Sequence, residues 1–293
     1  YGDHRDLHKE YRRQRQMCIR DRNITFKIGF IILFIHILIA ITGPFWAPYH
    51  YAAINVGEPL TGMSWKYPFG VDALGRDIFS RVIHGSWMVI SLSILGTSIG
   101  LLVGAFTGLF SAYAGGWIDE TIQRINEGFI SIPFLILGLL IILAAGPDLS
   151  GEPLLMSLAV AIVYAPRISR IARSAALEVI TKDFVIAARL RGESAISIIR
   201  REILPNTYGT LLVEFSVRAG FAPILIGSFG YLGFGIRPPF PEWGSIINDN
   251  RMLVYMSPIT VIGPAVALSS LVVSLNLFTE GLAQLLRTAK REL

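Results

Sequence analysis

The side chains best placed to do chemistry in this chain are an acid and a cation four residues apart, Glu214 and Arg218, within an otherwise apolar stretch. In a helix, this spacing with the acid first favours an ion pair. Ionisable side chains inside an apolar helix usually face a bundle interior or a water-filled cavity. The pair predicts the lining of a path for a solute, a mutually neutralised pair near one end of the helix, or a contact with a second subunit, and the sequence leaves these open.

No catalytic or metal-binding motif accompanies that pair. His4 and His8 have the i, i+4 spacing of a metal site, but they stand alone in a charged tail, and the other histidines are dispersed. The sequence contains no nucleophile–base pair, no H-E-x-x-H and no phosphate-cradling G-x-x-x-x-G-K-[ST]. We therefore predict no catalytic, cofactor or metal site, and we expect that this chain does not itself bind or hydrolyse ATP.

A second candidate site is the basic, amphipathic segment 183–205, which lies between long apolar runs. Asp183 can cap a helix that starts at Phe184, and helical spacing then puts Phe184, Ala187 and Ala188 on one side. Small side chains at the two alanines would let another protein surface come close. This half of the segment therefore predicts a contact surface.

The second half of the segment predicts another short helix. Gly192 breaks the first helix, Ser194 can cap the second, and Pro205 after Leu204 ends it. Two helices around a glycine elbow form either a compact knob for another protein to grip or a linker on the anionic inner leaflet, which basic residues also favour. The residues expected on one side of the second helix are Ile196, Ile199 and Ile203.

The elements that carry these sites are apolar. Of the 293 residues, 53% are hydrophobic and 16% are charged, against roughly 25% charged residues in soluble domains. A helix needs ~20 apolar residues to cross ~30 Å of hydrocarbon. Uncharged windows of about that size or longer argue against a soluble protein. They are Ile28–Gly57, Trp87–Gly116, Gly128–Pro147, Ala219–Ile236 and Met252–Thr279.

The windows predict an all-α membrane protein with about six transmembrane helices. The fourth is the weakest, because it requires the stems of Arg167 and Arg170 to snorkel towards the membrane surface. The spans are expected at about 24–46, 87–114, 128–146, 152–170, 206–230 and 256–281.

Arg and Lys counts predict the orientation. Eight lie in the N-terminal flank through Lys27 and eight in the loop 167–205, whereas the segments 47–86, 147–151 and 231–255 together hold five. Because positive loops stay in the cytoplasm, both termini and the loop 167–205 are expected inside. The net charge of +5 is thus explained by membrane topology rather than by nucleic-acid binding.

The expected organisation follows from these spans. The first apolar run is too long for a signal-peptide core, so we read it as an uncleaved helix after a basic cytosolic tail that is disordered or foreign to the protein. The expected parts are the tail 1–23, a first transmembrane helix 24–46, an extracytoplasmic loop 47–86, a membrane core 87–286 and a cytosolic C-terminus 287–293.

Several motifs, in this order and between these spans, resemble the second (C-type) transmembrane subunit of dipeptide/oligopeptide/nickel-type bacterial ABC importers. The likeness covers roughly residues 68–287. In the segment 183–205 it consists of Ala187-Ala188, Gly192 and Leu204-Pro205, which resemble that family's coupling loop. The other motifs are Pro68–Asp77, Tyr113–Asp119, Ile132–Phe134, Ile203–Asn206, Tyr231–Gly235 and Pro238–Gly244.

Two departures from the family pattern lie in the segment 183–205. The family usually begins its coupling loop Glu-Ala-Ala, but Ile186 stands in place of the glutamate, and Arg191 precedes Gly192 where relatives often have leucine. No role of a glutamate is therefore carried onto Ile186, and docking is expected to be tuned differently.

The resemblance implies an ATP-driven importer in a prokaryotic inner membrane. Its implied partners are a homologous permease subunit in a heterodimer, two cytosolic ATPase subunits, an extracytoplasmic solute-binding protein and the lipid bilayer, with no nucleic acid and no cofactor bound by this chain. Peptides or related small solutes are the implied cargo. An ion or solute channel, which needs no docking loop, and a membrane-embedded enzyme, which needs convergent catalytic side chains, are the alternatives.

The predicted extracytoplasmic segments carry a weaker candidate site. Asp72, Arg76 and Asp77, around Gly75, could form an ion-pair cluster whose use is geometry, because exposed pairs contribute at most ~1 kcal/mol. Trp243 can sit at the membrane interface, and structural bracing is the role expected for its proline-rich segment Pro238–Gly244. These residues cap the helix bundle or contact the binding protein, and the sequence does not choose between the two.

Overall fold

The computed structural model describes the backbone of residues 3–292 and the side chains of residues 24–282. Side chains of the predicted tail, including His4 and His8, and of the segment 287–293 lie outside these. Within the part described, the chain is helical, with one isolated β-bridge. The helices are α1 (Asp3–Trp46), α2 (Ile78–Ala114), α3 (Gly116–Ser131), α4 (Phe134–Ala144), α5 (Pro153–Ile180), α6 (Asp183–Leu190), α7 (Ala195–Ile198), the π-helix η1 (Ile199–Ile203), α8 (Leu204–Tyr231), α9 (Trp243–Asn250), the 3-10 helix η2 (Arg251–Leu253) and α10 (Ile259–Glu292).

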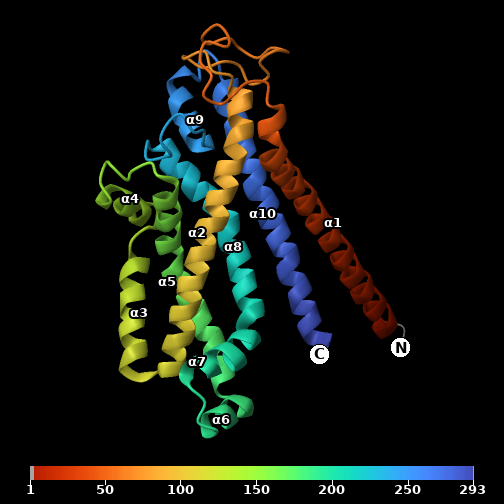
Figure 1. Ribbon diagram of the computed structural model, residues 1–293. Coiled ribbons are helices and arrows are strands. Elements are labelled where there is room, and N and C mark those ends of the chain that lie inside the picture. The colour runs from red at the N-terminus through yellow and green to blue at the C-terminus, as the bar shows by residue number, and fades with distance from the viewer. Residues whose placement is uncertain (1–2, 293) are drawn as a thin grey trace.

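The long helices run between two ends of the molecule (Figure 1). Helices α2 and α5 pack side by side, α8 packs against both, and α1 pairs with α10. Both chain ends and the short helices α6 and α7 lie at one end of the molecule, and the loop before α2 lies with α9 at the other. The segments predicted to lie on opposite sides of a membrane are thus at opposite ends of the molecule.

A stripe of glycines brings α2 and α5 together. A Cβ added to Gly104 would lie 2.5 Å from the carbonyl oxygen of Ala165, and one added to Gly108 would lie 2.2 Å from that of Ser169. Small residues allow this close backbone approach between membrane helices. The stripe, with one glycine per helical turn, is Gly96, Gly100, Gly104 and Gly108.

The predicted third span is wrong in shape. Five described helices are long and apolar enough to cross a membrane, and the pair α3 and α4, bent by 96°, adds a sixth if it counts as one broken span. The bend falls at Ile132 and Pro133, because proline disfavours helical backbone at the residue before it. Ile132 is accordingly extended, with φ −83° and ψ 131°. The expected loop before this span is the helix α3.

Two other boundaries differ from those predicted. Helix α2 begins at Ile78 rather than at Trp87, since Asp77 caps it by accepting the Ser80 N–H at 2.9 Å. The weak fourth span is the continuous helix α5, which extends ten residues beyond the predicted end at Arg170. Its extra turns pack on the predicted cytosolic segment, so α5 links the membrane core to that segment.

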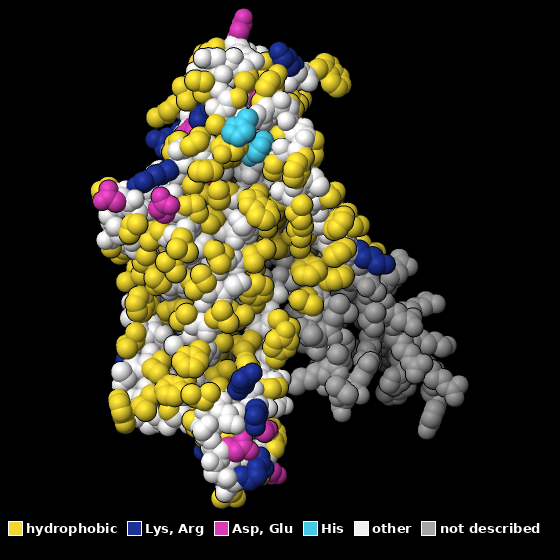
Figure 2. Space-filling model, in the orientation of Figure 1, with side chains coloured by type: hydrophobic (Ala, Val, Ile, Leu, Met, Phe, Trp, Pro, Cys, Tyr) yellow, Lys and Arg dark blue, Asp and Glu magenta, His cyan; other side chains and the backbone are white. Residues whose placement is uncertain are grey.

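The surface of the helix bundle fits a lipid environment. Apolar side chains cover the middle of the face seen in Figure 2, and the charged ones gather mainly towards its ends. Leu102 and Phe106 on α2 and Phe34 on α1 are among the large apolar side chains left exposed. Such a broad apolar surface marks contact with a membrane or with other subunits.

Candidate functional site

The segment 183–203 forms a knob at the end of the molecule that also holds both chain ends (Figure 1). It consists of α6, a glycine elbow, α7 and η1. The prediction that Asp183 caps α6 is wrong: the cap residue is Lys182, whose carbonyl accepts the N–H of Val185 at 3.0 Å. Asp183 is the first helical residue, where its negative charge interacts favourably with the positive end of the helix dipole.

One face of the knob is anchored in the core. Val185 and Ala188 are fully buried, and they pack in one cluster with Ala172 and Ala176 of α5 and Leu109 of α2. The prediction that Phe184, Ala187 and Ala188 share one side is therefore wrong. Ala188 faces inwards, whereas Ala187 and Phe184 are exposed, so the two adjacent alanines have different roles.

The predicted elbow is confirmed. Gly192 has φ +76°, a conformation that side-chain-bearing residues rarely adopt. Its N–H donates to the Arg189 carbonyl at 3.0 Å, and the Glu193 N–H donates to that of Ala188 at 3.3 Å, which closes α6 in a Schellman pattern. Ser194 then caps α7 by accepting the Ser197 N–H at 3.4 Å.

The second half of the knob differs from the prediction in two ways. Ile199 and Ile203 are buried as expected, but Ile196 is 70% exposed and Ile198 takes the inward position. Pro205 does not end the helix: it lies in the first turn of α8 after the π-helical η1. Because the helix is continuous across this join, the N–H that proline lacks frees backbone carbonyl groups, and a local π-helical turn is one way in which a helix re-satisfies them. The knob therefore continues directly into a membrane helix, with Leu204 half-buried at the join.

The outward face of the knob is apolar and unpartnered within this chain. Leu190 at the tip is 84% exposed. At the base of the knob, the Arg189 guanidinium lies 4.5 Å from the centre of the Tyr113 ring at the end of α2, which is a cation–π contact. The large apolar side chains on the outward face are Phe184, Ile186, Leu190 and Ile196.

The predicted pair in α8 forms within the helix bundle. Arg218 Nε lies 2.5 Å from Glu214 Oε1, and Glu214 is 7% exposed. The Arg218 guanidinium also stands 5.8 Å from the ring centre of Tyr164 on α5. The pair thus links α8 to α5, while its part in a solute path or a subunit contact stays a prediction.

Comparison with known proteins identifies the family. The family model described as "Binding-protein-dependent transport system inner membrane component" matches residues 100–292, which include the whole knob. The chain belongs to this family. The predicted likeness to ABC importer permeases is thereby confirmed.

The relatives are permease subunits. The chain is 32% identical to the dipeptide transport system permease protein DppC of Alkalihalophilus pseudofirmus, over 87% of this chain and 83% of the relative. It is 33% identical to the glutathione transport system permease protein GsiD of Pectobacterium atrosepticum, over 85% and 83%. This chain is a permease subunit of an ABC importer, and these relatives are components of membrane transport systems rather than enzymes.

A solved structure shows the same fold. The inward-facing MetNI methionine ABC transporter superimposes with a TM-score of 0.57 and 20% identity, over 71% of this chain and 95% of that one. The predicted all-α membrane fold is confirmed.

At the opposite end of the permease, the predicted ion-pair cluster has a different membership. Arg76 pairs with Asp72 at 2.5 Å and with Asp249 of α9 at 3.1 Å. Asp77 takes no part and caps α2 instead. Gly75 is required in the intervening turn, because its φ is +71° and a Cβ there would lie 2.8 Å from the Asn55 Cα. The cluster ties the loop before α2 to α9.

The predicted place of Trp243 at the membrane interface is wrong, because its side chain is fully buried. Its Nε1 donates to the Val82 carbonyl at 2.9 Å. The adjacent Glu242, which sequence reasoning passed over, caps α9: its carboxylate accepts the N–H groups of Gly244 at 2.7 Å and Ser245 at 2.9 Å. Burial raises the pKa of Glu242 to about 6. Trp243 and Glu242 are therefore bracing residues of the permease.

Proposed function

We propose that this permease is one half of a heterodimeric importer of short peptides, driven by two cytosolic ATPase subunits and supplied by an extracytoplasmic binding protein. The knob is its ATPase-docking element, and both chain ends lie in the cytoplasm. The observation that carries the proposal is the combination of a core-anchored face and an exposed apolar face on that knob.

The anchored face supports a role in transmitting movement. Val185, Ala188, Ile198 and Ile203 are fully buried against the inner ends of α2 and α5. Interiors packed in this way have low compressibility and transmit displacement. A push on the knob therefore reaches α2 and α5 through side-chain packing and α8 through the continuous backbone at Leu204.

The outward face supports docking. Leu190 and Ile196 are large apolar side chains at high exposure, whereas isolated domains seldom group such residues on a small projection. The basic residues around them do not form a surface suited only to anionic lipid, because one of them, Arg191, is paired with Glu193 at 2.7 Å. An apolar cleft on an ATPase subunit matches this face better than an anionic leaflet does.

The cargo and orientation rest on other observations. Two relatives are named for dipeptide and glutathione transport, and glutathione is itself a tripeptide derivative. Short peptides are thus the cargo class that the relatives share. The orientation rests on the excess of Arg and Lys at the end with the knob.

The test introduces a charge on the docking face. Leu190→Glu, in the transporter reconstituted with its binding protein, is expected to reduce alanyl-alanine uptake per ATP hydrolysed by about tenfold, the scale of a typical coupling energy. The matched control is Met63→Glu, an apolar position of comparable exposure (74%) in the loop before α2. Normal uptake per ATP in Leu190→Glu would refute the docking assignment.

A further inference from the structure

One face of α5 carries a polar stripe within a membrane helix. Arg167, Arg170, Ser174 and Glu178 recur every three or four residues and therefore lie on one side. Arg167 is 14 residues after Pro153, which places it ~21 Å along the helix at 1.5 Å per residue. The stripe thus starts inside the span and continues to the end of the molecule that holds the knob.

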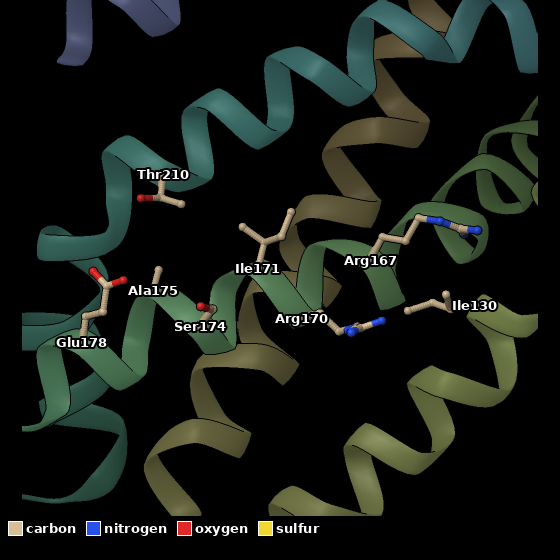
Figure 3. Close-up of a pocket in the computed structure, with 8 residues that line it drawn as sticks. All are labelled: Ile130, Arg167, Arg170, Ile171, Ser174, Ala175, Glu178 and Thr210. Carbon is tan, nitrogen blue, oxygen red and sulfur yellow. The ribbon is translucent and has the colours of Figure 1, made fainter.

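This stripe lines a pocket between three helices. The pocket has a volume of about 480 Å³ and is bounded by Ile130 of α3 and Thr210 of α8 as well as by α5, a size typical of small-molecule sites. Figure 3 shows the guanidinium groups of Arg167 and Arg170 extending to the same side, towards Ile130. We call the polar residues of this pocket, Arg167, Arg170, Ser174, Glu178 and Thr210, the polar seam.

The positive charges of the polar seam are not neutralised within the described part of the chain. Arg167 donates one hydrogen bond, to the Val163 carbonyl at 3.0 Å, and Arg170 has no hydrogen bond or ion pair with any described residue. Glu178 is eight residues beyond Arg170, ~12 Å along the helix. The nearby acid on α8, Glu214, is already paired with Arg218.

Charged side chains within a span are costly and face a wet cavity or a partner. A guanidinium offers five N–H donors in a planar fork that matches a carboxylate. We propose that the polar seam is an anion subsite of the translocation path, at which Arg167 and Arg170 receive the carboxylate of a solute in transit. With the peptide cargo proposed above, on which this last step rests, the group received is the C-terminal carboxylate.

The test measures the charge preference of the polar seam without assuming a cargo. Ser174→Cys, one turn from Arg170, is placed in a Cys18→Ser background, and the whole transporter is studied in inside-out vesicles. Its reaction rate with the anionic reagent sulfonatoethyl methanethiosulfonate is divided by that with the cationic trimethylammonium analogue. The preference for the anion is expected to fall by about tenfold when Arg167→Gln and Arg170→Gln are added. Thr121→Cys, exposed on α3 outside the pocket, serves as the control and should not respond to those changes.

Added dipeptide then tests the carboxylate. Alanyl-alanine should slow the labelling of Ser174→Cys, and its C-terminal amide should not. If the charge preference is present but neither compound protects, the subsite stands and the peptide cargo is wrong. An unchanged preference after removal of both arginines overturns the subsite. So does failure of either reagent to reach Ser174→Cys, which would mean that a partner subunit closes the polar seam. Charge preference that appears only in vesicles lacking phosphatidylglycerol would assign the arginines to a lipid headgroup instead, because a bound anionic headgroup neutralises them.

Discussion

At the scale of single residues, Glu242 combines a structural role with an electrostatic cost. Its carboxylate is fully buried and accepts three hydrogen bonds from Gly244 and Ser245, yet burial outweighs these and raises its pKa from 4.5 to about 6. The folded permease therefore holds this proton more tightly than the unfolded chain does. The stabilisation that this bound proton gives is complete below pH 4.5 and is lost as the pH rises through about 6. The free energy of unfolding is therefore about 2 kcal/mol lower at neutral pH than at low pH because of this one group.

Glu242→Gln should remove this dependence on pH. In lipid nanodiscs, the difference in melting temperature between pH 4.5 and pH 7 is expected to shift in the variant relative to the unmodified permease, with less stability lost on going to pH 7. Only the pH-dependent difference is compared, because glutamine also lacks one acceptor oxygen and lowers stability at every pH. Glu58→Gln, an exposed position in the loop before α2, should leave the difference unchanged. An identical pH response in Glu242→Gln and the unmodified permease would rule out the pKa shift.

Single residues also mark how far sequence reasoning reaches. Gly192, Ser194 and the pair Glu214–Arg218 could be predicted, because each depends on neighbours within one helical turn. The inward position of Ala188 and the burial of Trp243 could not, because each is decided by a surface distant in sequence, α5 in the first case and α2 in the second. The polar stripe beginning at Arg167 is visible in the sequence as a period of three to four residues, but the snorkelling prediction assigns its arginines to the membrane surface and not to a pocket.

At the scale of helices, the contact between α2 and α5 depends on absent side chains. The apolar windows predicted that both helices span the membrane, whereas the glycine stripe that sets their separation carries no hydropathy signal. The bend between α3 and α4 was signalled by Pro133 and was missed because the window was read as one continuous span. Hydropathy thus locates spans, and local backbone chemistry decides their shape.

The glycine stripe leads to a matched pair of substitutions. Gly108→Ala places a methyl group 2.2 Å from the Ser169 carbonyl oxygen, and such overpacking costs about 1–3 kcal/mol. Gly128→Ala, in α3 with no atom within 4 Å of the added methyl, should be neutral or stabilising by up to about 1 kcal/mol, because alanine is the better helix former. Thermal unfolding of the purified permease measures both. If Gly108→Ala is as stable as Gly128→Ala, the close approach of α2 and α5 is incorrect.

At the scale of the whole molecule, the length of α2 means that the two ends of this helix cannot lie on the same side of the membrane. Its 37 residues give a length of ~55 Å, well beyond the ~30 Å hydrocarbon core, so its two ends lie in different compartments. Glu120, just past the C-terminal end of α2, and Met63, in the loop before it, are both exposed. Each can therefore report one side of the membrane.

In a Cys18→Ser background, a membrane-impermeant maleimide should label Glu120→Cys in inside-out vesicles and Met63→Cys in intact spheroplasts, with little labelling in the opposite preparations. This outcome follows from the larger number of Arg and Lys residues at the end with the knob. Glu120 lies on α3 rather than on the knob, so a docked ATPase subunit at Leu190 does not by itself block the reaction. The reverse pattern would put the knob outside the cell, where no ATP-driven motor could reach it. ATPase docking would then fail together with the orientation, whereas the fold and the ion pair between Glu214 and Arg218 would be unaffected.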